Sequence, residues 1–159
     1  MSRNRNFNAT AIVLVVAAIT LVLDQWTKRL LISSFLPGES RLVLPHLLRW
    51  TYERNFHGAF GLFGSNGALL IALALAVLFI FWLSFRDAAA RSRLVCIAFG
   101  MIVGGAIGNI LDRLHFGYVV DFIDFYKIWP NIFNVADSCI TVGVILLMLS
   151  SLASSRRHA

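Results

Sequence analysis

The chain has 159 residues, of which 58% are hydrophobic, and its mean hydropathy is +0.77. A soluble domain of this length is far less apolar, so the composition excludes that class and indicates an integral membrane protein. The formal net charge of +6 does not indicate a nucleic-acid-binding protein, because no polar segment carries a basic stripe interleaved with aromatic residues.

Four apolar segments approach the length needed to cross the hydrocarbon core of a bilayer. They cover residues 7–23, 67–85, 94–111 and 138–153. Long connections, about residues 32–66 and 113–136, precede the second and fourth segments. The sequence therefore predicts an all-α membrane fold, in which one domain over residues 1–159 forms a four-helix bundle.

The first apolar segment ends in an acidic residue, Asp24, and the apolar pattern resumes at residues 30–31. No small-residue cleavage site follows the run, so we interpret it as a retained anchor and not as a cleaved signal peptide. Asp24 has two structural explanations: an ion pair with Lys28, one helical turn further on, or hydrogen bonds from the following connection.

The arginine pattern predicts the topology. With four spans both termini lie on one side, and the short segments on that side are rich in arginine. These arginines are Arg3, Arg5, Arg86, Arg91, Arg93, Arg156 and Arg157. Both termini are therefore predicted to be cytoplasmic, and both long connections to face outward.

The first long connection is predicted to contain a strand. Apolar and polar residues alternate over residues 48–53, and glycine and proline mark turns on either side. Ordered connections of this length are usually functional. A small β subdomain and an interfacial loop on the outer face are therefore expected.

The third span carries three glycines at four-residue spacing over residues 100–108, a pattern that lets helix backbones approach closely. Asp112 continues this stripe and is expected to face a neighbouring helix, while Asn109 and Arg113 lie on an adjacent stripe. An interfacial charge pair between Asp112 and Arg113 is the structural alternative.

The second long connection is predicted to be extended over residues 117–126, which are rich in β-branched and aromatic residues. Asp121 and Asp124 would then point to opposite faces of a strand and could not pair with each other. Asp137 opens the fourth span, three residues after Asn134. Asn134 could therefore be an N-cap with Asp137 in the first helical turn, which is a purely structural account.

Topology gathers most of these polar residues at one depth, because the first and third spans end on the outer side and the fourth begins there. A carboxylate at bilayer depth costs roughly 2.5–3.5 kcal/mol, so several at one face need a reason. The set comprises Asp24, Asn109, Asp112, Asn134 and Asp137, with Asn55 and Asp121 in the two outer connections.

Aspartic proteolysis is the chemistry that this set favours. No candidate cysteine nucleophile lies at this face, no base is placed to activate a serine, and the four histidines are scattered, so that neither a metal site nor a cofactor is predicted. Two acids held close share one proton: the protonated acid polarises a peptide carbonyl while the ionised one deprotonates water.

Two other classes remain open from the residues alone. A proton-coupled transporter would also use acids in the membrane, although the inner halves of the predicted spans offer almost no polar residues to carry protons. A membrane assembly factor could use the glycine-striped helix for docking, although that role leaves the acids unexplained.

Five ordered strings resemble the lipoprotein signal peptidase (signal peptidase II) family, and the match spans nearly the whole chain. The strings are Asp24-Gln25-Trp26-Thr27-Lys28, Arg54-Asn55 with Ala59-Phe60-Gly61, Gly108-Asn109-Ile110-Leu111-Asp112-Arg113, Val119-Val120-Asp121-Phe122 and Phe133-Asn134-Val135-Ala136-Asp137-Ser138. His57-Gly58 departs from the family, which usually has glycine two residues after the outer asparagine.

The resemblance implies an aspartic endopeptidase with Asp121 and Asp137 as the catalytic pair. It also implies supporting roles for Asp24, Asn55, Asn109, Asp112, Arg113 and Asn134. The implied substrate is a prolipoprotein with a diacylglyceryl-modified cysteine, cleaved just before that cysteine. The implied setting is the bacterial inner membrane, with the site at its outer face and membrane lipids around a chain expected to be a monomer.

The first outer connection is predicted to rest on the membrane interface and to clamp this substrate with aromatic side chains. These are Trp50, Tyr52, Phe56, Phe60 and Phe63.

Overall fold

The computed structural model describes residues 8–58, 66–89 and 92–155. Several expectations fall outside these ranges and are not described further. They concern Arg3, Arg5, Phe7, the string Ala59-Phe60-Gly61, Phe63, Arg91, Arg156 and Arg157.

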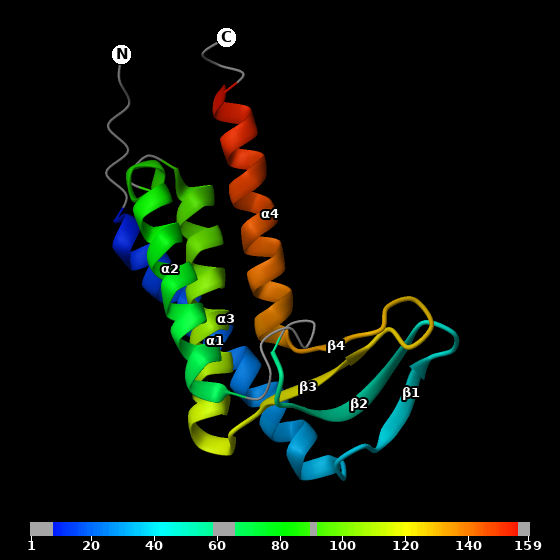
Figure 1. Cartoon of the computed structure of the whole chain (residues 1–159). Coiled ribbons are helices and arrows are strands. Elements are labelled where there is room, and N and C mark those ends of the chain that lie inside the picture. The colour runs from blue at the N-terminus through cyan, green and yellow to red at the C-terminus, as the bar shows by residue number, and fades with distance from the viewer. Residues whose placement is uncertain (1–7, 59–65, 90–91, 156–159) are drawn as a thin grey trace, which may run out of the picture.

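Four helices dominate the described part of the chain (Figure 1), and each is long and apolar enough to cross a membrane. They are α1 (Ala9–Ser34), α2 (Gly67–Ala89), α3 (Arg93–Phe116) and α4 (Val135–Ser155). Helix α1 runs well beyond the first apolar segment, because Asp24 and Lys28 find partners inside the protein. Gly117 ends α3 in the left-handed conformation, with φ of +79°, which a glycine adopts without strain.

Helix α3 lies at the centre of the bundle and packs against α1, α2 and α4. Small residues make this possible. A methyl group on Gly104 would collide with the Ala17 carbonyl of α1, and one on Gly105 would lie 2.6 Å from the Ala136 carbonyl of α4. The prediction that the glycine stripe allows close backbone approach is confirmed.

The two long connections together form one antiparallel sheet in the order β1-β2-β3-β4. Its strands are β1 (Ser40–Leu44), β2 (Leu48–Asn55), β3 (Val119–Asp124) and β4 (Ile132–Phe133). The expected strand at residues 48–53 and the extended segment within residues 117–126 are both present. The sheet projects sideways from one end of the bundle (Figure 1), so the predicted fold class is confirmed.

An apolar cluster joins this sheet to the bundle. Leu31 of α1 packs with Tyr52, Val120 and Phe122 of the sheet, and all four side chains are buried. Tyr52 is only 3% exposed, so its predicted place on the membrane interface is wrong. The cluster fixes β2 and β3 over the ends of α1 and α3, where the polar residues lie.

Candidate active site

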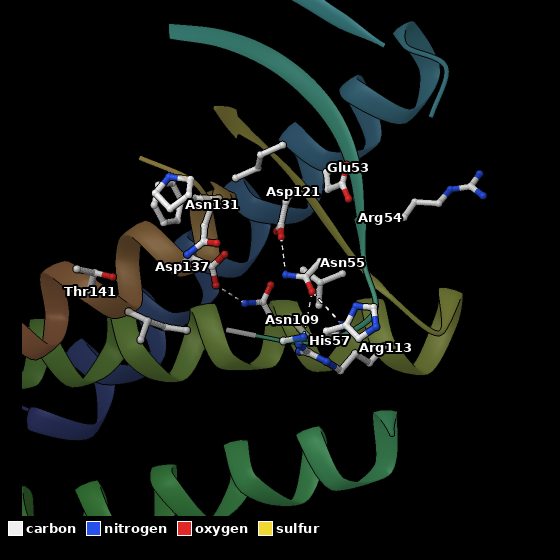
Figure 2. A pocket seen from close by; sticks show the side chains of 16 residues that line it. Glu53, Arg54, Asn55, His57, Asn109, Arg113, Asp121, Asn131, Asp137 and Thr141 are labelled. Atoms are coloured by element: carbon white, nitrogen blue, oxygen red, sulfur yellow. Dashed lines mark hydrogen bonds between the residues drawn. The ribbon is translucent and has the colours of Figure 1, made fainter. Parts of the chain in front are cut away.

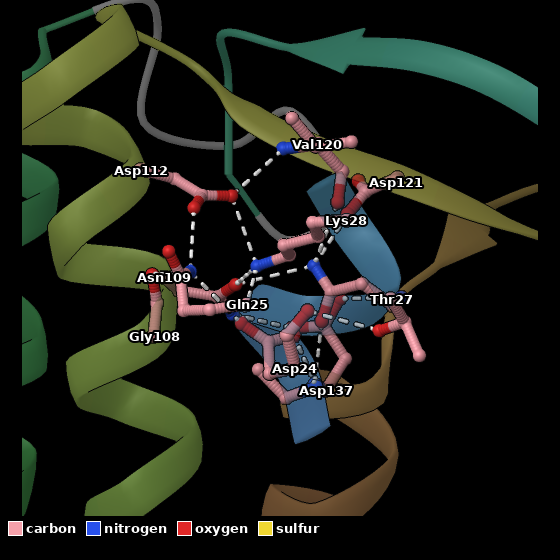
Figure 3. Close-up of polar contacts among 12 residues, drawn as sticks. Asp24, Gln25, Thr27, Lys28, Gly108, Asn109, Asp112, Val120, Asp121 and Asp137 are labelled. Atoms are coloured by element: carbon pink, nitrogen blue, oxygen red, sulfur yellow. Dashed lines mark hydrogen bonds and ion pairs between the residues drawn. The ribbon is translucent and has the colours of Figure 1, made fainter. Parts of the chain in front are cut away.

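Lys28 lies at the centre of a buried polar network that the sequence analysis did not assign to the site (Figure 3). Its Nζ atom lies 2.8 Å from Asp24 Oδ2, 2.9 Å from Asp112 Oδ2 and 3.0 Å from Asn109 Oδ1. The predicted Asp24–Lys28 pair is confirmed. No ion pair forms between Asp112 and Arg113, because Asp112 faces Lys28 instead.

The two acids beside Lys28 also tie elements together. Asp24 Oδ1 accepts a hydrogen bond of 2.9 Å from the Ala136 amide, which joins α1 to the start of α4. Asp112 accepts one of 3.0 Å from the Val120 amide and one of 2.9 Å from Gln25 Nε2. Because their oxygens are occupied by Lys28 and backbone donors, Asp24 and Asp112 act as a frame for the neighbouring side chains.

Three asparagine side chains form hydrogen bonds to Asp121 and Asp137. Asn109 Nδ2 donates to Asp137 Oδ1 at 2.8 Å, and Asn134 Nδ2 donates to Asp121 Oδ1 at 2.7 Å. Asn55 Nδ2 donates to Asp121 Oδ2 at 2.8 Å. Since Lys28 can only donate, it fixes the carbonyl oxygen of Asn109 toward itself and leaves the amide nitrogen for Asp137.

Asn134 has a second role at the start of α4. Its Oδ1 accepts a hydrogen bond of 2.8 Å from the Asp137 amide, so the predicted N-cap is confirmed. The same amide group therefore begins the helix with its oxygen and holds Asp121 with its nitrogen.

Asp121 and Asp137 line one cavity of about 600 Å³ between the sheet and the bundle. Figure 2 shows Asp121 reaching from β3 and Asp137 from the first turn of α4 toward the same space, with Asn55 and Asn109 beside them. The cavity wall also includes Arg113 and apolar side chains. The apolar members are Val119, Pro130, Ile132, Phe133 and Ile140.

The surroundings of Asp121 make it a weak acid. Burial, followed by the neighbouring carboxylate of Asp137, raises the pKa of Asp121 to about 7, against the opposing effect of Asn55, Asn134 and Lys28. Asp121 therefore keeps its proton through mildly acidic pH and loses it near neutrality. The negative charge of Asp137 is the second cause of this raised pKa, as expected for two carboxylates that line the same cavity.

Arg113 and the end of β2 form another part of the cavity wall. Arg113 Nη1 donates to the backbone carbonyl of Asn109 at 3.2 Å. Asn55 Oδ1 accepts from the amides of His57 and Gly58 at 3.1 and 2.9 Å, which closes a turn in which Gly58 has φ of +71°. The glycine that this turn requires is present here, one position later than in the related family pattern.

Asp124 lies outside the cavity. It is buried at the other side of β3, where it pairs with Arg49 and accepts a hydrogen bond of 2.8 Å from Thr51 Oγ1. The structure therefore separates Asp124 from Asp121, as the strand alternation predicted.

Sequence reasoning did not assign Lys28 and Gln25 of the polar network to this site. It also missed four polar residues of the cavity wall, which are Glu53, Arg54, Asn131 and Thr141. The four-residue spacing from Asp24 identified Lys28 only as a local partner, whereas its contact with Asp112 depends on the packing of α1 against α3. No group of three or more His, Cys, Asp or Glu side chains among the described residues is arranged to hold a metal ion.

Comparison with known proteins gives a consistent result. Residues 16–153 match the profile of the family described as Signal peptidase (SPase) II. The lipoprotein signal peptidase of Halothermothrix orenii is 38% identical over 137 residues, which cover 86% of this chain and 92% of the relative. That of Cupriavidus necator is 40% identical over 151 residues, which cover 89% of this chain and 83% of the relative.

Solved structures extend the likeness to the fold. A bacterial membrane enzyme determined at 2.3 Å resolution by the in meso method has a TM-score of 0.85 and 30% sequence identity, covering 94% of this chain and 92% of its own. A second bacterial membrane enzyme, determined at 1.9 Å, has a TM-score of 0.79 and 31% identity, covering 89% and 93% of the two chains.

Proposed function

The chain belongs to the signal peptidase II family of lipoprotein signal peptidases, a multi-pass membrane peptidase family, and we propose that it cleaves by aspartic catalysis with Asp121 and Asp137 as the catalytic pair. Its function is the removal of signal peptides from prolipoproteins. The observation that carries the catalytic proposal is the convergence of these two carboxylates, from β3 and α4, on one cavity.

The pair shares one proton, and we place it on Asp121, whose raised pKa of about 7 lets it stay protonated in mildly acidic conditions. Asp137 takes a proton from water as the water oxygen attacks the scissile carbonyl carbon, and Asp121 gives its proton to the carbonyl oxygen. When the tetrahedral intermediate collapses, the C–N bond breaks, Asp137 protonates the leaving nitrogen and Asp121 recovers its proton. No acyl-enzyme forms.

The remaining polar residues hold this pair. Asn55 and Asn134 position Asp121, and Asn109 positions Asp137. Asp24, Asp112 and Lys28 hold the amides in turn, and Arg113 adds a positive charge to the cavity wall. Second-layer contacts of this kind maintain a catalytic geometry that the reacting groups cannot hold alone.

The substrate that the family resemblance implies fits the cavity wall. The proposed scissile bond precedes a cysteine that bears a diacylglyceryl group. Val119, Ile132, Phe133 and Ile140 give the cavity an apolar side next to the carboxylates, so that acyl chains can stay in hydrocarbon while the peptide bond reaches the acids. No nucleic acid or cofactor enters this proposal, and the chain is expected to act as a monomer.

The proposed orientation places both termini in the cytoplasm and the cavity at the outer face of the bacterial inner membrane. A Lys127→Cys variant, in a background without Cys96 and Cys139, should react with a membrane-impermeant maleimide in intact spheroplasts. An Asp87→Cys variant in the last turn of α2 should react only after permeabilisation. The reverse pattern would contradict the orientation.

The decisive experiment is cleavage of a purified precursor by the reconstituted protein. Asp121→Asn and Asp137→Asn should each abolish cleavage while the protein still inserts and unfolds at a similar temperature. Asp124→Asn is the matched control, because it changes a buried acid of the same strand outside the cavity and should retain cleavage. Full turnover by either of the first two variants, with deamidation excluded by mass spectrometry, would contradict the catalytic assignment.

The same vesicles test the substrate class and the transporter alternative. Diacylglyceryl-modified precursor should be cleaved and unmodified precursor left intact; equal cleavage of both would overturn the proposed substrate. Proton flux should be absent. The relatives are peptidases, and the buried polar side chains among the described residues lie near the sheet end of the bundle, so nothing supports a transport pathway.

A further inference from the structure

The end of the sheet farthest from the helices forms a small surface with its own chemistry (Figure 1). There the turn between β1 and β2 meets the connection between β3 and β4: the His46 amide donates to the Tyr126 hydroxyl at 2.7 Å, and Lys127 Nζ lies 3.0 Å from His46 Nδ1. We call this surface the sheet tip. It comprises His46, Tyr126, Lys127, Ile128 and Trp129.

The sheet tip carries a cation that no acid neutralises among the described residues. Lys127 forms no ion pair there, whereas Arg49, whose guanidinium lies 5.1 Å from the Tyr126 ring centroid, is paired with Asp124. Because an ammonium group only donates, His46 Nδ1 accepts from Lys127, and the neutral imidazole then carries its proton on Nε2. An anion arriving at this surface therefore meets donors from both side chains.

Exposed apolar side chains adjoin this cation. Ile128 is 63% exposed and Trp129 47%, and Leu44 and Leu47 of the neighbouring turn are 48% and 39% exposed. Single exposed apolar residues are ordinary, but tryptophan and aliphatic side chains beside a basic group make up surfaces that rest at the headgroup level of a bilayer.

The fold sets this surface at the height where the span of α4 begins. In Figure 1 the sheet curves so that the connection between β3 and β4 reaches the level of the first turn of α4, where that span begins. If the four helices span a bilayer, a surface at this height is placed to face the headgroups of the adjoining leaflet.

We propose that the sheet tip binds the headgroup of an anionic phospholipid, with the phosphate at Lys127 and His46 and with Ile128 and Trp129 inserted beside it. The positive charge of the sheet tip matches the phosphate of such a lipid, and the apolar side chains match the acyl region beside it. This contact would hold the outer edge of the sheet on the bilayer and keep the cavity at a fixed depth. It does not depend on the peptidase proposal.

The test uses Trp129 as a reporter. In a full-length variant with Trp26, Trp50 and Trp82 replaced by Phe, fluorescence is measured in nanodiscs that contain brominated phosphatidylglycerol or brominated phosphatidylcholine at equal bromine content. We expect at least twofold stronger quenching by the anionic lipid, and a Lys127→Ala change should remove this excess. Arg41→Ala is the matched control, because Arg41 lies in the same sheet but is paired with Glu39.

A second measurement leaves all tryptophans in place. Native mass spectrometry of the wild-type protein, extracted from mixed-lipid nanodiscs, should show one more retained phosphatidylglycerol than a His46→Ala/Lys127→Ala variant. One cation near an anionic surface is worth about 1 kcal/mol, which corresponds to about a fivefold change in retention. Equal quenching by both lipids, or equal retention by both proteins, would overturn the proposal and leave the cation for an acidic protein partner.

Discussion

At the scale of single residues, the site depends on side chains whose surroundings change their ordinary chemistry. Asp121 is an acid that keeps its proton up to about pH 7, and Lys28 is an ammonium that is 2% exposed between two carboxylates. Burying either ionisable group alone would cost free energy. Contacts with groups on other elements offset this cost. A change at Asp121 should therefore alter the dependence on pH, and a change at Lys28 should alter the unfolding temperature.

The raised pKa of Asp121 predicts a pH limit on activity. The value of kcat/KM should fall as the pH rises through about 7, because Asp121 then loses the proton that, in the proposed mechanism, it gives to the carbonyl oxygen. Asn55 lowers this pKa by donating to the carboxylate, so Asn55→Ala should move the alkaline limit to higher pH while it lowers the maximal rate. A limit that does not move would separate Asp121 from the observed titration.

The same shift has a consequence for stability. The folded pKa of about 7 exceeds the unfolded value of roughly 3.9, so the folded state binds the proton more tightly. The contribution of Asp121 to stability is therefore most favourable at acidic pH and is lost as the pH rises from about 4 through 7. Asp121→Asn should flatten the dependence of thermal unfolding on pH in that interval.

Lys28→Met tests the buried ion network. The change leaves Asp24 and Asp112 facing each other without a cation, and breaking a buried pair in this way costs roughly 3–5 kcal/mol. A large fall in the unfolding temperature is expected. Arg29→Met is the control, since Arg29 is the next residue and is exposed. Equal effects of the two changes would contradict a structural role for the network.

At the scale of elements, the position of α4 against α3 decides where Asp137 lies. Gly105 lets the two backbones meet at the first turn of α4, next to Ala136. The sequence predicted the glycine stripe, the strands β2 and β3 and the cap of α4 from local patterns, but not β1 or β4. It did not predict that Lys28 joins Asp112, or that Tyr52 is buried, because both depend on how distant elements pack.

Gly105→Ala should reduce cleavage more than it reduces stability. The added methyl group would lie 2.6 Å from the Ala136 carbonyl, so α4 must move and carry Asp137 with it. Overpacking of this kind costs about 1–3 kcal/mol. Cleavage rate and unfolding temperature are measured together. Gly67→Ala provides the comparison, because nothing lies within 4 Å of its added methyl group.

At the scale of the whole molecule, the site exists only where the sheet and the helix bundle meet. Asp121 belongs to the sheet and Asp137 to the bundle, and no local segment contains both. Asp112 is one of the links, since it joins α3 to the Val120 amide of β3. The order of the five family strings indicated that these parts belong together, but the contacts between them required the structure.

Asp112→Ala should loosen this junction while the spans stay folded. Hydrogen exchange is expected to rise at β3, beginning with the Val120 amide, and to stay unchanged in the middle of α3. Asp124→Asn is the comparison variant. Asp124 links β3 to Arg49 and Thr51 of β2 and does not contact the Val120 amide. Unchanged exchange at β3 after loss of Asp112 would show that apolar packing alone holds the sheet.

The double use of the Asn134 side chain limits how this chain can evolve. Aspartate at this position would still begin α4 but would offer no amide donor to Asp121, and a serine hydroxyl would supply the cap without the reach of the longer side chain. A mutation here changes the start of a membrane span and the electrostatics of an acid in the same step. Selection therefore cannot adjust the start of this span and the proposed catalysis separately at this position.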